Sequence, residues 1–200
     1  MFYYLDGVIA DIEPGFVVVD IGGVGYQCFT TANTMSYLEK GKKARLYTYC
    51  NIKEDAFDIY GFHDTSEKRS FEMLLSVSGV GPKAAISILS SVTPEQFAMA
   101  VISENEKAFT TAPGIGKRIA QRIILELKDK ISKENGSIKS TGAVIPGGAQ
   151  LSGNKLSEAT AALTVLGYSS AEITNALRQI DVEALSVEDI IRSVLKASVK

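Results

Sequence analysis

A sequence pattern that could bind phosphate occurs twice in this 200-residue chain. The segment SGVGPK at residues 78–83 returns as PGIGKR at residues 113–118, and matching Ala and aliphatic positions follow both copies. Two glycines around one aliphatic residue allow a tight turn, the aliphatic side chain enters the core, and the next helix begins with unpaired N–H groups. The pattern is typical of a helix–hairpin–helix, and its repetition favours a functional motif over a simple helix–helix turn.

Unpaired N–H groups at a helix N-terminus suit a phosphate, because the helix dipole adds partial positive charge and glycine lets the backbone approach closely. We therefore predict contacts to DNA strands that do not depend on base sequence. The predicted DNA-binding residues are Gly79, Gly81, Lys83, Gly114, Gly116, Lys117, Arg118 and Arg122.

The net charge of the chain is −2, from 21 Lys and Arg against 23 Asp and Glu, and this total alone weighs against a nucleic-acid binder. The balance differs by region: residues 1–63 have five basic and eight acidic groups, residues 64–136 have ten and nine, and residues 137–200 have six of each. The acidic residues Glu95, Glu104 and Glu106 fall between the two repeats, where they need not face bound DNA.

The residue pattern gives little support for nucleotide binding, catalysis or metal binding. A nucleotide-binding loop of the form G-x-x-x-x-G-K-[ST] is disfavoured, because Arg118 follows Lys117 where Ser or Thr is required. His63 lacks the spacing to other groups that catalysis or zinc binding needs, and Cys28 and Cys50 lie in no motif. We expect no catalytic residue, no metal and no cofactor.

Short runs of β-branched and aromatic residues, broken by Gly, Pro and Asp, predict strands in residues 1–63. The predicted strands are residues 2–11, 16–21, 24–30, 43–51 and 56–62. Residues 32–40 could hold one or two helical turns between the third and fourth strands. This order suits a closed five-stranded barrel of the oligonucleotide/oligosaccharide-binding type (OB-type), although the pattern alone does not separate it from other five-stranded barrels.

The rest of the chain has helical periodicity, so the predicted fold class is α+β with several domains. Residues 64–134 are predicted to form a helical domain with two helix–hairpin–helix motifs. Residues 135–154, rich in Gly and poor in apolar side chains, are predicted to be a flexible linker. Residues 155–200 are predicted to form three helices, with capping sequences beginning at Ser169 and Ser186. We expect this tethered C-terminal domain to be mobile and to bind a partner.

No apolar run approaches the ~18 residues of a membrane-spanning helix, and the N-terminus lacks a signal-peptide layout. A cytoplasmic location without membrane contact is therefore predicted.

The chain as a whole resembles the RuvA family of Holliday-junction-binding subunits. The resemblance is carried by Tyr60-Gly61-Phe62 at the end of the barrel, the paired glycine motifs, the loose linker and Leu166-Gly167-Tyr168 near the C-terminus. It implies a non-catalytic homotetramer that holds a four-way DNA junction open and flat during homologous recombination and DNA repair. It also implies that residues 155–200 recruit the RuvB ATPase motor for branch migration, and we expect contacts at exposed apolar positions around Leu166 and Tyr168.

The family resemblance further implies an acidic pin formed by Glu54 and Asp55, between the fourth and fifth strands. Four copies would place eight carboxylates near the phosphates at the junction centre, where repulsion keeps the strands apart. The RuvC junction resolvase as a further partner, and a second tetramer that completes an octamer on DNA, stay open alternatives.

Two other functions compete with this interpretation. Paired helix–hairpin–helix motifs also occur in repair nucleases and lyases that act on branched DNA, but the sequence offers no carboxylate cluster or reactive lysine for such a reaction. A protein-interaction adaptor fits the C-terminal helices and leaves both glycine motifs unexplained.

Overall fold

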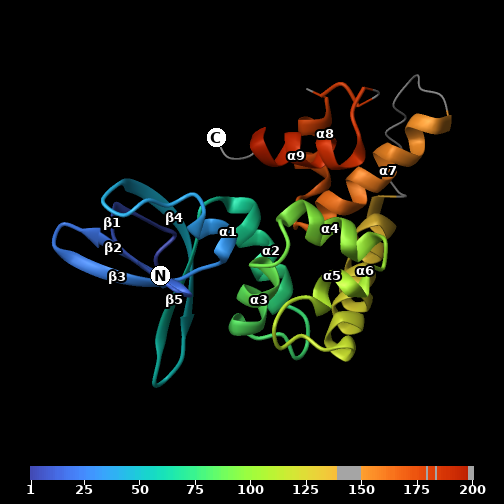
Figure 1. Ribbon diagram of the computed structural model, residues 1–200. Coiled ribbons are helices and arrows are strands. Elements are labelled where there is room, and N and C mark those ends of the chain that lie inside the picture. The colour runs from blue at the N-terminus through green and yellow to red at the C-terminus, as the bar shows by residue number, and fades with distance from the viewer. Residues whose placement is uncertain (139–149, 179, 183, 198–200) are drawn as a thin grey trace.

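The N-terminal part of the molecule is a closed five-stranded barrel (Figure 1). Its strands are β1 (Tyr4–Glu13), β2 (Phe16–Ile21), β3 (Val24–Phe29), β4 (Lys43–Ile52) and β5 (Phe57–Phe62). They follow the order β1-β2-β3-β5-β4, and all neighbours are antiparallel except β3 and β5, which pair in parallel. The barrel confirms the predicted architecture, and helix α1 (Ala32–Met35) occupies the predicted helical insertion.

Burial and strand pairing together define the barrel strands. Alternate residues point inward, so that Ile9, Val17, Val19 and Leu46 have no exposed surface. Strand β1 begins and ends two residues later than predicted, because its pairing with β4 starts at Tyr4 and its pairing with β2 continues as far as Glu13. The other strand ends lie within one residue of the prediction.

Both cysteines are free thiols buried in the barrel. Burial, with a smaller contribution from nearby Cys50, raises the pKa of the Cys28 thiol to about 12. The Cys28 thiol therefore stays protonated near neutral pH, which makes it a poor nucleophile.

The middle of the chain is helical, as predicted. Its helices are α2 (Thr65–Leu75), α3 (Pro82–Leu89), α4 (Pro94–Ile102), α5 (Glu106–Thr110) and α6 (Lys117–Ile138). The predicted start of α4 is confirmed by a capping box, in which Thr93 and Gln96 exchange hydrogen bonds between side chain and backbone. Phe71, Phe97 and Phe109 are fully buried at the centre of this domain.

The C-terminal helices pack directly on the middle of the chain (Figure 1). They are α7 (Gln150–Val165), α8 (Ser170–Leu177) and α9 (Val187–Ala197). As predicted, α7 ends before Gly167, which has a φ of +77°, and α8 begins with a capping box at Ser169. Leu163 and Ile191 belong to the same buried cluster as Phe97, so α7 and α9 share one core with α4. The composition of the preceding segment gave no sign of this docking.

The structure, a computed structural model, describes residues 1–138, 150–178, 180–182 and 184–197. The predicted linker lies mostly outside the described residues; where it is described, residues 135–138 continue α6 and residues 150–154 begin α7. Among the described residues, no single helix is long and apolar enough to cross a bilayer, although the bent pair α3 and α4 meets the same criterion on length and composition alone.

Candidate nucleic-acid interface

The two glycine motifs form hairpins with the same backbone geometry. Gly79 and Gly114 have φ angles of +86° and +82°, a region that residues with a side chain rarely adopt. In each turn the N–H of the aliphatic residue, Val80 or Ile115, donates to the carbonyl oxygen three residues before it, at 3.1 Å. The side chains of Val80 and Ile115 are buried, as the helix–hairpin–helix prediction requires.

The second glycine of each hairpin leaves the start of the next helix open. Gly81 is the N-cap of α3 and makes no side-chain cap, and Gly116 directly precedes α6. A Cβ atom placed on either glycine would have no neighbouring atom within 4 Å. An anion can therefore approach the N-terminal N–H groups of both helices without displacing protein atoms.

The predicted cations surround these hairpins but differ in their contacts. Lys83, Lys117, Arg118 and Arg122 are all exposed. The Nζ atom of Lys117 lies 3.9 Å from a carboxylate oxygen of Glu106, and Arg122 donates to a backbone carbonyl oxygen. Within the described part of the chain, no ion pair involves Lys83 or Arg118. These two side chains are thus available to a phosphate without breaking a salt bridge.

Of the acidic residues between the two repeats, Glu106 lies beside the second hairpin. Its helix, α5, leads into the second hairpin, and its carboxylate contacts both Lys117 and Gln121 at the start of α6. A second carboxylate, which the sequence pattern did not single out, belongs to Glu126 and accepts the backbone N–H of Ser78 at 3.1 Å. Its only local signal is the i,i+4 spacing from Arg122.

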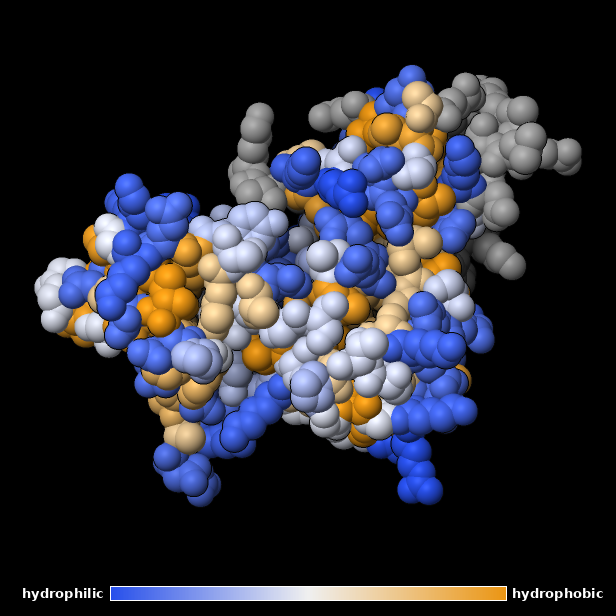
Figure 2. All heavy atoms as spheres, in the orientation of Figure 1, coloured by the Kyte–Doolittle hydropathy of each residue, from blue (hydrophilic) through white to orange (hydrophobic). Residues whose placement is uncertain are grey.

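The predicted acidic pin lies at the tip of the β4–β5 hairpin. Glu54 and Asp55 are exposed, and the N–H of Lys53 closes the turn by donating to the carbonyl oxygen of Ala56 at 2.8 Å. Figure 1 shows this hairpin extending to the same side of the molecule as the loops that enter α3 and α6. In the same orientation, Figure 2 shows hydrophilic side chains at the lower extremities of both the barrel and the helical region.

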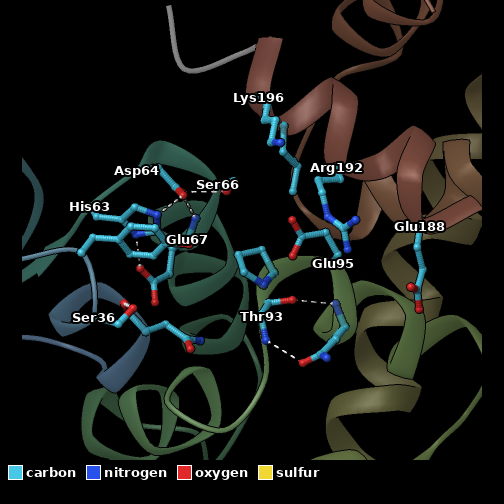
Figure 3. A pocket seen from close by; sticks show the side chains of 15 residues that line it. Ser36, His63, Asp64, Ser66, Glu67, Thr93, Glu95, Glu188, Arg192 and Lys196 are labelled. Atoms are coloured by element: carbon cyan, nitrogen blue, oxygen red, sulfur yellow. Dashed lines mark hydrogen bonds and ion pairs between the residues drawn. The ribbon is translucent and has the colours of Figure 1, made fainter.

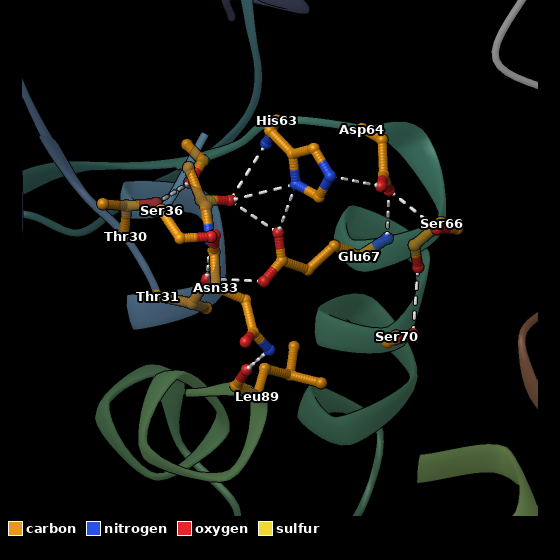
Figure 4. A network of polar contacts seen from close by, with 12 residues as sticks. Thr30, Thr31, Asn33, Ser36, His63, Asp64, Ser66, Glu67, Ser70 and Leu89 are labelled. Carbon is orange, nitrogen blue, oxygen red and sulfur yellow. Dashed lines mark hydrogen bonds and ion pairs between the residues drawn. The ribbon is translucent and has the colours of Figure 1, made fainter. Parts of the chain in front are cut away.

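A buried polar network joins the barrel to the helical domain (Figure 4). The carboxylate of Glu67, which has no exposed surface, accepts hydrogen bonds of 2.5 Å from the hydroxyls of Thr31 and Thr34. The His63 ring lies between this carboxylate, 3.1 Å from Nδ1, and that of Asp64, 2.9 Å from Nε2. Burial acts to lower the pKa of His63, but hydrogen bonds with the two carboxylates outweigh it and raise the pKa to about 9. The histidine is therefore a protonated structural link.

A cavity of about 660 Å³ opens next to this network, between α1, the start of α2, α4 and α9 (Figure 3). Its charged lining is mixed, with Glu95 and Glu188 beside Arg192 and Lys196. The residues of the two glycine hairpins are not part of the lining that the structure describes. Among the described residues, no group of three or more His, Cys, Asp or Glu side chains is placed to hold a metal ion.

The structure corrects the prediction that Leu166 and Tyr168 are exposed for a partner. Leu166 has no exposed surface and Tyr168 is 3% exposed, because α7 packs this segment against the central helices. Arg69 of α2 covers it: its guanidinium lies 4.2 Å from the centre of the Tyr168 ring and donates to Glu172 at 3.1 Å and to the carbonyl oxygen of Gly167 at 3.5 Å.

Comparisons with known proteins match the whole chain. A family model described as the RuvA N-terminal domain matches residues 1–61, a SAM-like tandem helix-hairpin-helix model matches residues 71–129, and a RuvA C-terminal domain model matches residues 154–199. Curated proteins named Holliday junction branch migration complex subunit RuvA are similar over nearly their full length. The protein of Ruminiclostridium cellulolyticum is 44% identical, with 98% of this chain and 100% of the relative covered. Those of Acetivibrio thermocellus (45% identical, 98% of each chain) and Caldanaerobacter subterraneus (46%, 100% of each) are equally similar.

Proposed function

The chain belongs to the RuvA family, and from this membership and the hairpin geometry we propose that it binds four-way (Holliday) junction DNA independently of base sequence. The observation that carries the proposal is the pair of hairpins with matching turns and open helix N-termini, on the same side of the molecule as an acidic hairpin tip. Two backbone anion sites suit two phosphates, and the acidic tip suits the gap between strands at a crossover.

Each hairpin meets one stretch of DNA backbone through the N-terminal N–H groups of α3 or α6. Lys83 supplies the charge at the first hairpin, and Lys117 and Arg118 supply it at the second. Gly81 and Gly116 allow the phosphate to come close, because no side chain stands between it and the backbone. These contacts read the backbone and not the bases, so binding follows the shape of the junction.

We further propose that Glu54 and Asp55 act as the acidic pin of a homotetramer, near the phosphates at the crossover. The tetramer is non-catalytic and works in the cytoplasm, in recombination and repair. The segment around Leu166 and Tyr168 is buried and cannot meet a partner directly. The RuvB motor therefore binds the exposed faces of α7–α9 instead. A second tetramer on the DNA and contact with the RuvC resolvase are compatible with this arrangement.

A gel-shift comparison tests the central claim. The purified chain is expected to bind a four-way junction more tightly than a linear duplex of the same sequence composition, and to bind junctions of unrelated sequence equally well. The logarithm of the binding constant should fall steeply with the logarithm of the salt concentration, by roughly 0.9 for each phosphate neutralised. Equal affinity for junction and duplex would remove the structure-specific part of the proposal.

A further inference from the structure

The two hairpins are tied to each other by a reciprocal pair of hydrogen bonds. The Ser87 hydroxyl on α3 donates to the carbonyl oxygen of Pro113 in the second hairpin, at 2.8 Å. Arg122 on α6 donates from Nη1 to the carbonyl oxygen of Ser78 in the first hairpin, at 3.3 Å. In the sequence repeat, Ser87 corresponds to Arg122 and Ser78 to Pro113. Each helix therefore bonds to the loop of the other motif from the equivalent position of the repeat. These two hydrogen bonds set the separation of the two loops.

The two bonds differ in reach and charge. Serine is short, so the second loop lies directly against α3, whereas the longer arginine side chain bridges α6 to the first loop. Glu126, one turn further along α6, places a carboxylate oxygen 3.9 Å from Nε of Arg122. The other oxygen of that carboxylate accepts the N–H of Ser78 at 3.1 Å. The pair thus bonds both backbone groups of the residue that precedes Gly79.

We propose that Arg122 and Glu126 form a clamp that positions the first glycine loop for its phosphate, and that Arg122 is a positioning residue and not a phosphate contact. The inference rests on the proposed junction binding and revises the role that the sequence suggested for Arg122. Its guanidinium already makes one backbone hydrogen bond and faces a carboxylate, whereas Arg118 forms no ion pair with any residue that the structure describes.

The clamp matters because two anion sites on one rigid body must match phosphates at a fixed spacing. Fixing the first loop before binding lowers the ordering cost on the DNA. The pair is also electrically balanced: without Arg122, the Glu126 carboxylate beside the first hairpin would repel the incoming phosphate.

The test compares Arg122→Gln with the double variant Arg122→Gln/Glu126→Gln in junction binding across a salt series. The single variant leaves Glu126 unbalanced, so junction affinity is expected to fall about tenfold. In the double variant the amide oxygen of Gln can still accept the Ser78 N–H and no charge is left unpaired. Its affinity is expected to recover in part, because the repulsion is gone while the bond from Arg122 to the Ser78 carbonyl oxygen stays broken, and its salt slope should equal that of the wild type. The Arg122 side chain is 51% exposed and that of Glu126 is 33% exposed, so neither change disturbs the core.

Lys117 and Glu106 give a matched control at the second hairpin, because they too form an exposed cation–carboxylate pair at 3.9 Å. Lys117→Gln is expected to weaken binding and to make the salt slope shallower by roughly 0.9 for each phosphate that the variant no longer neutralises. Adding Glu106→Gln should leave that slope shallow.

Two outcomes overturn the clamp: no loss of affinity in Arg122→Gln, or a double variant whose salt slope is as shallow as that of Lys117→Gln. Binding of the wild type to junction and duplex in the same series tests the proposed function separately. A wild-type chain that prefers the junction, with a double variant whose salt slope is as shallow as that of Lys117→Gln, would refute the clamp alone.

Discussion

His63 is held between the carboxylates of Asp64 and Glu67 where the barrel meets α2. Its pKa is raised from 6.5 to about 9 in the folded protein, so the folded state retains a proton that the unfolded chain releases at lower pH. The stabilisation is therefore fully present below pH 6.5 and is lost as the pH rises through about 9. This behaviour is opposite to that of a carboxylate with a lowered pKa, whose stabilisation is lost in acid.

We predict that the free energy of unfolding declines between pH 6.5 and 9, by at most about 3 kcal/mol from this group. Replacing the ring by an uncharged amide in His63→Gln removes the titration, so the variant should be less stable at pH 6 and nearly flat over the same range. Urea unfolding of the wild type and the variant at four or five pH values measures the stability at pH 6 and its change with pH. A variant that keeps the wild-type decline would show that another group causes it.

At the scale of the hairpin, the two glycines have separable roles. Gly114 has a φ of +82°, which alanine adopts only with strain, whereas Gly116 has no positive φ and open space where a Cβ would stand. Gly114→Ala is expected to lower the free energy of unfolding by roughly 1–2 kcal/mol. Gly116→Ala should leave stability unchanged and weaken junction binding, because its methyl group occupies the approach of the phosphate.

Thermal unfolding and gel shifts on the same two variants check this pair of predictions. The equivalent change Gly81→Ala repeats the second experiment at the first hairpin, where the Cβ would again meet nothing within 4 Å. Normal DNA binding by Gly116→Ala would mean that the phosphate stays farther from the backbone than the hairpin geometry suggests.

The elements that the sequence predicted correctly carry local signals. The capping boxes at Thr93 and Ser169 and the glycine hairpins each lie within a few residues, so spacing alone reveals them. The contacts that it missed join distant segments. Arg69 reaches Glu172 from 103 positions away, and that contact helps to bury the segment that was expected to be exposed. No local pattern encodes which helix covers an apolar face, so docking had to come from the structure.

Because local patterns do not encode contacts between distant segments, the sequence predicted the positions of the site residues but not all of their contacts. The repeat indicated where cations would gather, and all four predicted side chains are exposed near the hairpins. It could not show that Arg122 faces Ser78, or that Glu106 lies beside Lys117, because both relations depend on how the second hairpin packs.

For the molecule as a whole, the net charge of −2 matters less than its distribution. The acidic excess belongs to the barrel, whereas the hairpins present cations and helix N-termini. Figure 1 places the pin and both hairpin loops on one side and α7–α9 at the other end. A motor bound to those helices would therefore leave the proposed DNA side free.

The acidic pin gives the prediction at this scale. If Glu54 and Asp55 approach the phosphates at the crossover, the double variant Glu54→Gln/Asp55→Asn should bind the junction roughly three to ten times more tightly, because repulsion is relieved. Binding to a linear duplex should not change. A fluorescent base analogue at the crossover should also report less unstacking, since fewer charges keep the strands apart.

The control removes the same charge far from the tip, in Glu13→Gln/Glu39→Gln. Glu39 lies shortly before the start of β4. Glu13 ends β1, which runs antiparallel to β4 and extends past the start of β4. Strand β4 has ten residues, and at about 3.3 Å per residue its two ends lie on the order of 30 Å apart, which is several Debye lengths at physiological salt. The control should therefore change junction affinity less than twofold. An equal gain in both variants would attribute the effect to net charge, and the pin would then have no special place at the crossover.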